Sequence, residues 1–167
     1  MNVFVTVGTD HHPFERLMDW VDRWAASHRE ARVVVQHGTS RAPKVSLAVP
    51  LCSASDMRGY FDGADVVVCA GGPGTIMDAR AAGRKPIVVP RRRHLGEHVD
   101  DHQLEFARYT GRAGVVVVVE SEDDFESALG IALADRAAYR FEPEDEPTPE
   151  GILRFGSLVD RLMWPSG

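Results

Sequence analysis

The stretch of the sequence richest in chemistry is a glycine-rich turn, Gly71-Gly-Pro-Gly-Thr75, which follows the apolar run from Val66 to Cys69. An uninterrupted apolar run of this kind is typical of a parallel strand covered on both faces. Glycines let the backbone approach a ligand closely, and the unpaired N–H groups at the start of the next helix attract anions. The turn therefore predicts a phosphate site formed by Gly72, Gly74 and Thr75.

The spacing of this turn differs from the common nucleotide fingerprints. The first predicted strand is not followed by G-x-G-x-x-G, and G-x-x-x-x-G-K-[ST] occurs nowhere in the chain. The sequence therefore lacks the motif of a dinucleotide-dependent oxidoreductase and also that of a P-loop enzyme. Another kind of nucleotide site is required.

Two more polar loops follow predicted strands. The first is Gly8-Thr9-Asp10-His11-His12, and the second runs from Pro90 to Gln103 with three arginines, three histidines, three carboxylates and one amide. A run of charged residues is often only a solvated surface loop, and this alternative stays open for each of the three arginines. Because the carboxyl ends of parallel strands share one edge of a sheet, both loops are expected to meet the glycine turn.

Composition sets wider limits. The chain has 167 residues, 26% of them charged and 44% hydrophobic, which predicts one soluble globular domain. Its net charge of -6 argues against a nucleic-acid partner. We expect neither a membrane span nor a signal peptide, hence a cytoplasmic protein. Cys52 and Cys69 adjoin apolar runs and are expected to be buried, reduced thiols.

Strand and helix patterns alternate along the chain with short connections. Strands are predicted at residues 3–7, 33–36, 45–49, 66–69, 86–89 and 115–119, with helices between them that include 55–61 and 99–109. This alternation predicts an α/β fold: a three-layer αβα arrangement around a mostly parallel, six-stranded sheet. Ligands bind such sheets beyond the carboxyl ends of the strands.

The end of the chain has a different character. We expect a domain over residues 1–140, an acidic linker over 141–150 and an amphipathic helix over 151–167. The helix has an apolar stripe made of Ile152, Phe155, Leu158, Val159, Leu162 and Met163. Two alternatives are open for this stripe, since it completes either the core of its own domain or an interface with a partner.

Taken together, the motifs resemble a known family. They are Thr6-Val-Gly-Thr9 with Pro13-Phe14 and Arg16-Leu17; Ala64-Asp65 with the glycine turn and Asp78; and Gly96-Glu-His-Val-Asp-Asp-His-Gln103. In order over residues 3 to 110, they resemble the C-terminal half of the MurG-type glycosyltransferases. They resemble more closely the small bacterial exopolysaccharide subunits related to the eukaryotic subunit that adds the second N-acetylglucosamine to dolichol-linked chitobiose.

The resemblance implies a single half-domain of the GT-B fold, which is Rossmann-like. It implies a donor-binding subunit of a two-component inverting glycosyltransferase, which transfers a hexose from a UDP-sugar to a lipid-linked saccharide acceptor. The acceptor would be bound by a membrane-anchored glycosyltransferase subunit, which would also recruit this chain to the inner face of the membrane. A non-catalytic, regulatory UDP-binding module is the alternative.

The resemblance also assigns parts of the donor to residues. The diphosphate is expected at Gly8, Thr9, Gly74 and Thr75, and the ribose hydroxyls at Asp78. That aspartate is one methylene shorter than the glutamate of the MurG enzymes. Uracil is expected against the backbone of residues 50–57.

The hexose is expected at Asp100, His102 and Gln103, with His98 near the sugar or the phosphates. Asp101 ranks lower, as a cap or a solvated residue. For the arginines between Arg91 and Gly96 three roles stay open: contact with the leaving diphosphate, with a carboxylated donor, or with the phosphates of the acceptor.

The expected reaction is direct displacement with inversion at the anomeric carbon. Helix N-termini and cations can stabilise the leaving UDP, so neither a metal ion nor another cofactor is expected. The general base is the open question, because in the MurG enzymes it is usually assigned to the acceptor-binding half. Within this chain His11 and His12 are the catalytic candidates.

Overall fold

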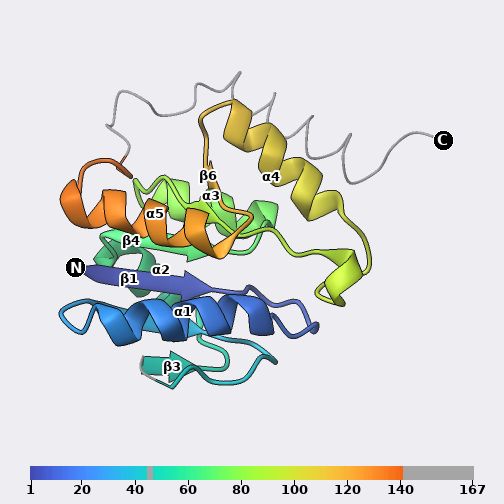
Figure 1. Cartoon of the computed structure of the whole chain (residues 1–167), viewed down its shortest axis with the longest axis horizontal. Coiled ribbons are helices and arrows are strands. Elements are labelled where there is room, and N and C mark those ends of the chain that lie inside the picture. Colours follow the sequence, from blue (N-terminus) through green and yellow to red (C-terminus); the bar gives the residue numbers. More distant parts are fainter. Residues whose placement is uncertain (45–46, 141–167) are drawn as a thin grey trace.

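The computed structural model describes residues 1–44 and 47–140. Their strands form one fully parallel sheet in the order β3-β2-β1-β4-β5-β6 (Figure 1). The strands are β1 (Asn2–Thr6), β2 (Arg32–Gln36), β3 (Leu47–Val49), β4 (Val66–Cys69), β5 (Ile87–Val88) and β6 (Val117–Val118). The predicted six-stranded α/β fold is thereby confirmed.

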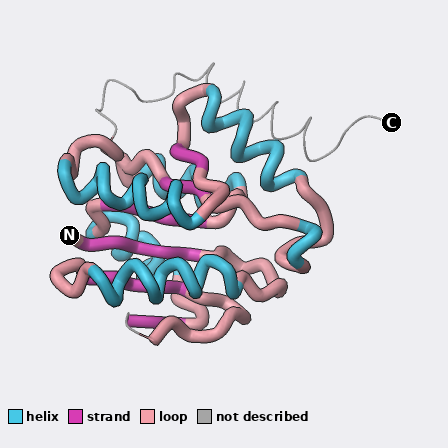
Figure 2. The backbone as a smooth tube through the Cα atoms, viewed as in Figure 1, coloured by secondary structure: helices cyan, strands magenta, loops and turns pink. Residues whose placement is uncertain are grey.

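Helices cover both faces of the sheet (Figure 2). They are α1 (Glu15–Ser27), α2 (Ala54–Gly63), α3 (Pro73–Ala81), α4 (His102–Arg112) and α5 (Glu122–Ala134), with a short 3-10 turn at Arg93–Leu95. Side chains of α1 and α5 pack with Val3, Val5 and Val68 on one face. The opposite face packs Phe4 and Val67 against α2 and α3, and Val88 against α3 and α4.

The alternation of faces explains why the strands are apolar throughout. Successive side chains of a strand point to opposite faces, and here both faces are covered by helices. In β4 all four residues are buried, with Val66 and Val68 on one face and Val67 and Cys69 on the other. The parallel connections bring every strand's carboxyl end to the same edge of the sheet.

One predicted helix boundary needs correction. The helix expected over 99–109 begins at His102 and ends at Arg112. The three residues before it form a turn, in which Asp100 accepts a hydrogen bond from the backbone N–H of His102 at 3.1 Å. The strand expected from residue 45 is described from Leu47 on; residues 45–46 lie outside the described part, so its first boundary stays a prediction.

Other expectations meet the structure only in part. Cys69 is buried and free, and burial raises its pKa to about 12, whereas Cys52 is free but only half-buried. No described helix is long and apolar enough to cross a membrane. The acidic linker 141–150 and the helix 151–167 lie outside the described residues.

Candidate functional site

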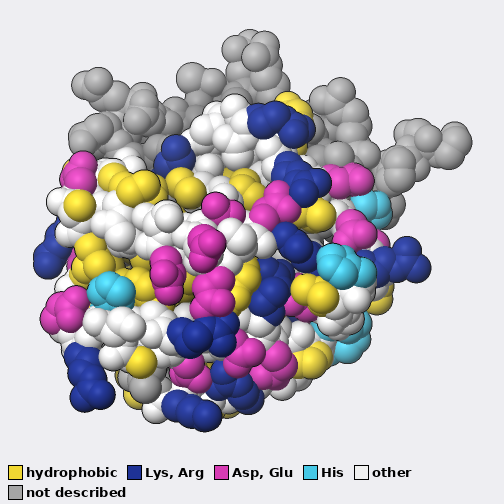
Figure 3. Space-filling model, in the orientation of Figure 1, with side chains coloured by type: hydrophobic (Ala, Val, Ile, Leu, Met, Phe, Trp, Pro, Cys, Tyr) yellow, Lys and Arg dark blue, Asp and Glu magenta, His cyan; other side chains and the backbone are white. Residues whose placement is uncertain are grey.

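The three polar loops converge at the carboxyl edge of the sheet. The loop after β1 meets the turn after β4 directly, because a Cβ placed on Gly8 would lie 3.8 Å from Oγ1 of Thr75. Gly8 has a φ of 74°, a left-handed conformation that glycine adopts without strain. Most of the histidine side chains visible in Figure 3 gather at this end of the molecule, on the right. The predicted meeting of the loops is present in the fold.

A buried polar network fixes the position of Gly8. Thr6 donates its hydroxyl to Gln36 Oε1 at 2.6 Å, and its oxygen accepts the N–H of Gly8 at 3.2 Å. The amide nitrogen of Gln36 then donates to the carbonyls of Gly8 at 3.1 Å and Pro50 at 3.0 Å. Gln36, the last residue of β2, therefore ties the loop after β1 to the loop after β3.

The glycine turn opens α3 as the sequence predicts. Gly72 is the residue before the first turn and Pro73 is the first helical residue, where its missing N–H costs nothing. Around Gly72 and Gly74 an added Cβ would meet no described atom within 4 Å. The first turn of α3 also holds no acidic residue. The helix start is thus open to an anion.

Asp78 lies farther along α3, in the second turn, with its side chain exposed. It lines a groove of about 440 Å³ between α2 and α3, together with Met57 of α2. The residue expected at the ribose therefore shares a groove with Ala54 and Met57, two members of the stretch expected at uracil. The expected stretch 50–57 includes the N-cap residue Ser53 and the first turn of α2.

The residues expected at the hexose also come together. A small cavity of about 80 Å³ is lined by Gly71, Pro73, His98, Asp100, His102, Gln103 and Phe106. Gly71 packs so closely on α4 that a Cβ there would lie 2.9 Å from the carbonyl oxygen of Gln103. The Oε1 atom of Gln103 is buried and has no hydrogen-bond partner among the described residues. A buried acceptor without a partner is costly, and a ligand hydroxyl would satisfy it.

Imidazoles and carboxylates alternate between the first and third loops. His12 Nδ1 lies 2.8 Å from Asp10 Oδ1, and Asp10 Oδ2 lies 3.2 Å from His98 Nε2. Asp100 then lies 3.2 Å from His98 Nδ1 and 3.3 Å from His102 Nδ1. This histidine–aspartate chain, from His12 to His102, spans the edge between the expected phosphate and sugar subsites.

Asp10 links His12 to His98 in that chain. Burial raises the pKa of Asp10, but hydrogen bonds from the backbone and side chain of His12 and the charges of Arg91 and His98 outweigh it. The pKa of Asp10 therefore lies below its ordinary value, and the carboxylate stays charged. Asp10, His11 and His12 also offer ligand atoms within 4.8 Å of one another, a spacing that a metal ion could use.

The roles left open for Arg91 are wrong, because its side chain is fully buried. Its guanidinium donates to the carbonyls of Val7 at 3.1 Å, His12 at 2.8 Å and Glu97 at 3.0 Å. Arg91 thus holds the first and third loops together and does not face a ligand. Arg92 bonds to the carbonyl of Glu120, while Arg93 is exposed.

Sequence reasoning missed several positioning residues. Glu97 is 4% exposed and forms a two-bond ion pair with Arg16, with both N···O distances at 2.8 Å. It also accepts the N–H of Arg92 at 2.9 Å. Asp10, Gln36 and Glu97 carry no distinguishing spacing; the only available signal was a polar residue at the end of an apolar strand or inside an expected site loop.

Comparison with known proteins agrees with this geometry. The model of the glycosyltransferase family 28 C-terminal domain matches residues 2–145. Two UDP-N-acetylglucosamine--N-acetylmuramyl-(pentapeptide) pyrophosphoryl-undecaprenol N-acetylglucosamine transferases are similar over shorter stretches. That of Coxiella burnetii is 33% identical over 75 residues, 45% of this chain and 20% of that protein. That of Rubrobacter xylanophilus is 38% identical over 78 residues, 46% and 22% respectively. The matched segment thus spans about a fifth of these relatives.

Solved structures share the fold at low identity. The solution structure of ALG13 has a TM-score of 0.61 at 18% identity, and the match covers 91% of this chain and 94% of that one. The MurG crystal structure from Acinetobacter baumannii has a TM-score of 0.54 at 20% identity, covering 81% and 41%. The fold is that of a GT-B half-domain. Because the family model matches most of this chain, residues 2–145, the chain belongs to the glycosyltransferase family 28 C-terminal domain family.

Proposed function

We propose that this chain is the donor-binding half of an inverting glycosyltransferase that takes a hexose from a UDP-sugar. The observation that carries the proposal is the meeting of three loops at the carboxyl edge of the sheet. There an open helix start, with Gly72 and Gly74 unobstructed by described atoms, lies beside the amide oxygen of Gln103, which has no hydrogen-bond partner within residues 1–44 and 47–140. An anion subsite next to a hydroxyl-reading subsite suits a sugar diphosphate.

The donor would lie across these loops. Its diphosphate would accept hydrogen bonds from the backbone at Gly74 and Thr75, with Gly8 and Thr9 facing it. Its uridine would extend toward the groove between α2 and α3, which Asp78 and Met57 line. The cavity at Gln103, about 80 Å³, has room for part of a hexose, so the sugar would lie across its mouth.

The acceptor would be bound by a second half. The described residues form one half of a two-domain architecture, with the expected site open at the edge of the sheet. We propose that a membrane-anchored glycosyltransferase subunit supplies that half, recruits this chain to the cytoplasmic face of the membrane and presents a lipid-linked saccharide. The names of the curated relatives, which act on a pyrophosphoryl-undecaprenol lipid, support such an acceptor. The product would enter exopolysaccharide or glycan synthesis.

The reaction would be a single displacement. An acceptor hydroxyl attacks the anomeric carbon, the bond from that carbon to the diphosphate oxygen breaks, and UDP leaves with the electron pair. The positive end of α3 would stabilise the charge on UDP, so the proposal requires no metal ion.

His12 is the better candidate for the base that takes the proton from the acceptor hydroxyl. Asp10 holds its Nδ1 atom at 2.8 Å, which orients the ring and would stabilise the imidazolium, whereas His11 is exposed. His12→Gln should therefore lower transfer at least about a hundredfold and leave UDP affinity unchanged. His11→Gln is the matched control, and equal losses in both variants would exclude this role.

Transfer itself is tested by coexpression with a membrane subunit encoded beside this chain. Membranes holding both proteins are supplied with radiolabelled UDP-hexoses, and the lipid extract is counted. Label in lipid only when both proteins are present supports the proposal. UDP binding without transfer to any extracted lipid would favour a non-catalytic, regulatory UDP-binding module.

A further inference from the structure

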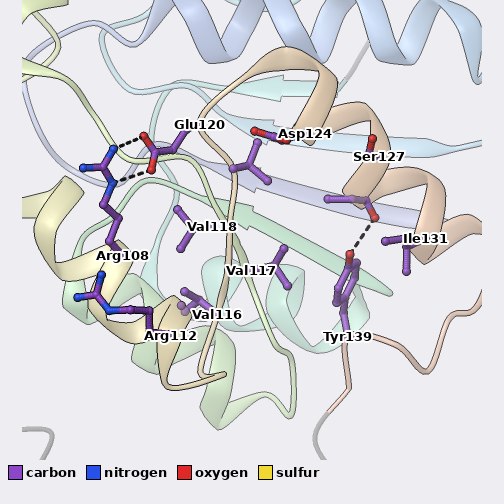
Figure 4. A pocket seen from close by; sticks show the side chains of 13 residues that line it. Arg108, Arg112, Val116, Val117, Val118, Glu120, Asp124, Ser127, Ile131 and Tyr139 are labelled. Carbon is purple, nitrogen blue, oxygen red and sulfur yellow. Dashed lines mark hydrogen bonds and ion pairs between the residues drawn. The ribbon is translucent and has the colours of Figure 1, made fainter.

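A large cavity lies away from the candidate site, at the β6 edge of the sheet. It is a groove of about 710 Å³ between α4, β6 and α5 (Figure 4). Its floor is apolar and includes Val116, Val117 and Val118. Ile131 of α5 faces it and is 54% exposed. We call it the α4–β6–α5 groove.

The α4–β6–α5 groove leaves the outer edge of strand β6 uncovered on its solvent side. In the described part of the chain β6 pairs with β5 alone, so its outer edge is free of strand partners. Free strand edges and contiguous apolar surface promote association, and folded proteins usually cover them. On one side α4 already packs tightly on the strand, since a Cβ on Gly111 would lie 2.5 Å from a methyl group of Val118. Only the side toward solvent needs a cover.

The chain carries a suitable cover close by. The described residues end at Arg140, and Tyr139 lines the groove, with its hydroxyl donating to the carbonyl of Ala128 at 3.1 Å. Ten residues, 141–150, separate this point from the apolar stripe of residues 151–163. An extended chain of ten residues reaches at most about 35 Å. A 13-residue helix would be about 20 Å long, the same as the 13-residue α5 beside the groove.

Charge favours the same arrangement. The connecting stretch carries five acidic residues: Glu142, Glu144, Asp145, Glu146 and Glu150. The rim of the groove presents Arg108 and Arg112, and Arg136 and Arg140 lie beyond the end of α5. Arg108 is already paired with Glu120, at 2.7 Å on both bonds, whereas Arg112 is exposed. Glu120 and Asp124 line the groove as well, and Arg140 lies 3.5 Å from Asp65, so the exposed Arg112 and Arg136 are the cations that an acidic segment leaving Arg140 would meet.

Covalent attachment favours this segment over a second molecule as the occupant of the groove. A segment tethered by about ten residues is present at its groove at an effective concentration on the order of millimolar. A second copy or a partner would have to exceed that concentration or bind more tightly. We propose that residues 151–163 form an amphipathic helix that lies in the α4–β6–α5 groove of the same chain and covers the β6 edge. The apolar stripe would then complete the core of its own domain.

Cysteine cross-linking in the full chain tests this placement. In a Cys52→Ser background, Ile131→Cys is combined in turn with Phe155→Cys, Leu158→Cys and Leu162→Cys. Ser157→Cys, on the opposite face of the same helix, is the matched control. Mild oxidation should give an intramolecular disulfide in monomers for at least one stripe position, at least about tenfold faster than for Ser157.

Three results would overturn the proposal: no cross-link at any stripe position, equal rates for the stripe and Ser157, or disulfides only between two chains. The last would identify a second copy as the occupant. Hydrogen exchange supplies a readout that needs no engineered disulfide. Phe155→Asp should raise exchange at residues 116–119 and Ser157→Asp should not, and unchanged exchange in the first variant would also contradict the proposal. Neither experiment involves a nucleotide, so failure here leaves the proposed function untouched.

Discussion

The carboxylate of Asp10 lies 3.2 Å from Nε2 of His98, and this contact joins the loop after β1 to the loop after β5. The first of these loops is expected at the diphosphate and the second at the sugar. The buried guanidinium of Arg91 also joins the two loops, because it donates hydrogen bonds to the carbonyls of His12 and Glu97. The two expected subsites are therefore held in a fixed relation before any ligand arrives, which lowers the ordering cost of binding.

The buried guanidinium of Arg91 should matter for stability. Arg91→Met keeps an unbranched apolar stem but removes the guanidinium and leaves three carbonyls without that donor, which should lower the free energy of unfolding by about 3 kcal/mol. Arg93→Met, two residues away and exposed, is the matched control and should change it by less than about 0.5 kcal/mol. Urea unfolding measures both. Similar small losses would contradict the structural role assigned to Arg91.

Gln103 should read the sugar and not the nucleotide. Gln103→Ala keeps the backbone and the Cβ that pack against Gly71, so the phosphate turn stays in place. Transfer should fall by up to about tenfold, the value of one hydrogen bond, while the Kd for UDP stays unchanged. Exposed Glu105, on the same helix, supplies the control Glu105→Ala. A parallel loss of UDP affinity and transfer in Gln103→Ala would contradict the assignment.

Glu120 should make stability depend on pH. Hydrogen bonds from Arg108 are the main cause that lowers the pKa of Glu120, against the opposing effect of burial. A lowered folded-state pKa adds stability above the unfolded value, near 4.5, and that stability is lost as the pH falls through the folded value. The urea midpoint of Glu120→Gln should lie below that of the wild type at pH 7, and the gap should close below pH 4.5. Glu126→Gln, exposed on α5, is the control; a gap independent of pH would refute the linkage.

The sequence predicts the strands and helices of this protein better than it predicts where each helix begins. Strands such as Val66–Cys69 are readable because apolar runs alternate with helical periodicity, and that pattern depends only on which faces are buried. The start of α4 at His102 is not readable in this way. It depends on hydrogen bonds that the side chains of Asp100 and Asp101 accept from the backbone N–H groups of His102 and Arg93.

The site follows the same rule. Gly72, Gly74 and Thr75 are found from the sequence because a strand–glycine–helix connection has a fixed geometry. The burial of Arg91 and the pairing of Asp10 with His98 depend on how separate loops pack. An arginine in a charged loop looks the same in sequence whether it faces solvent or three carbonyls.

Titration calorimetry of the purified chain with UDP tests the central claim most directly. The wild type should bind UDP, and Thr75→Ala should weaken binding by about 0.5–1.5 kcal/mol through loss of one hydroxyl contact. Gly74→Val should weaken it more, since its side chain would project into the open space at the start of α3 without striking a described atom. Ser27→Ala, at the far end of α1, should bind as the wild type does. Absence of UDP binding by the wild type, or equal affinity in all four proteins, would contradict the assigned site.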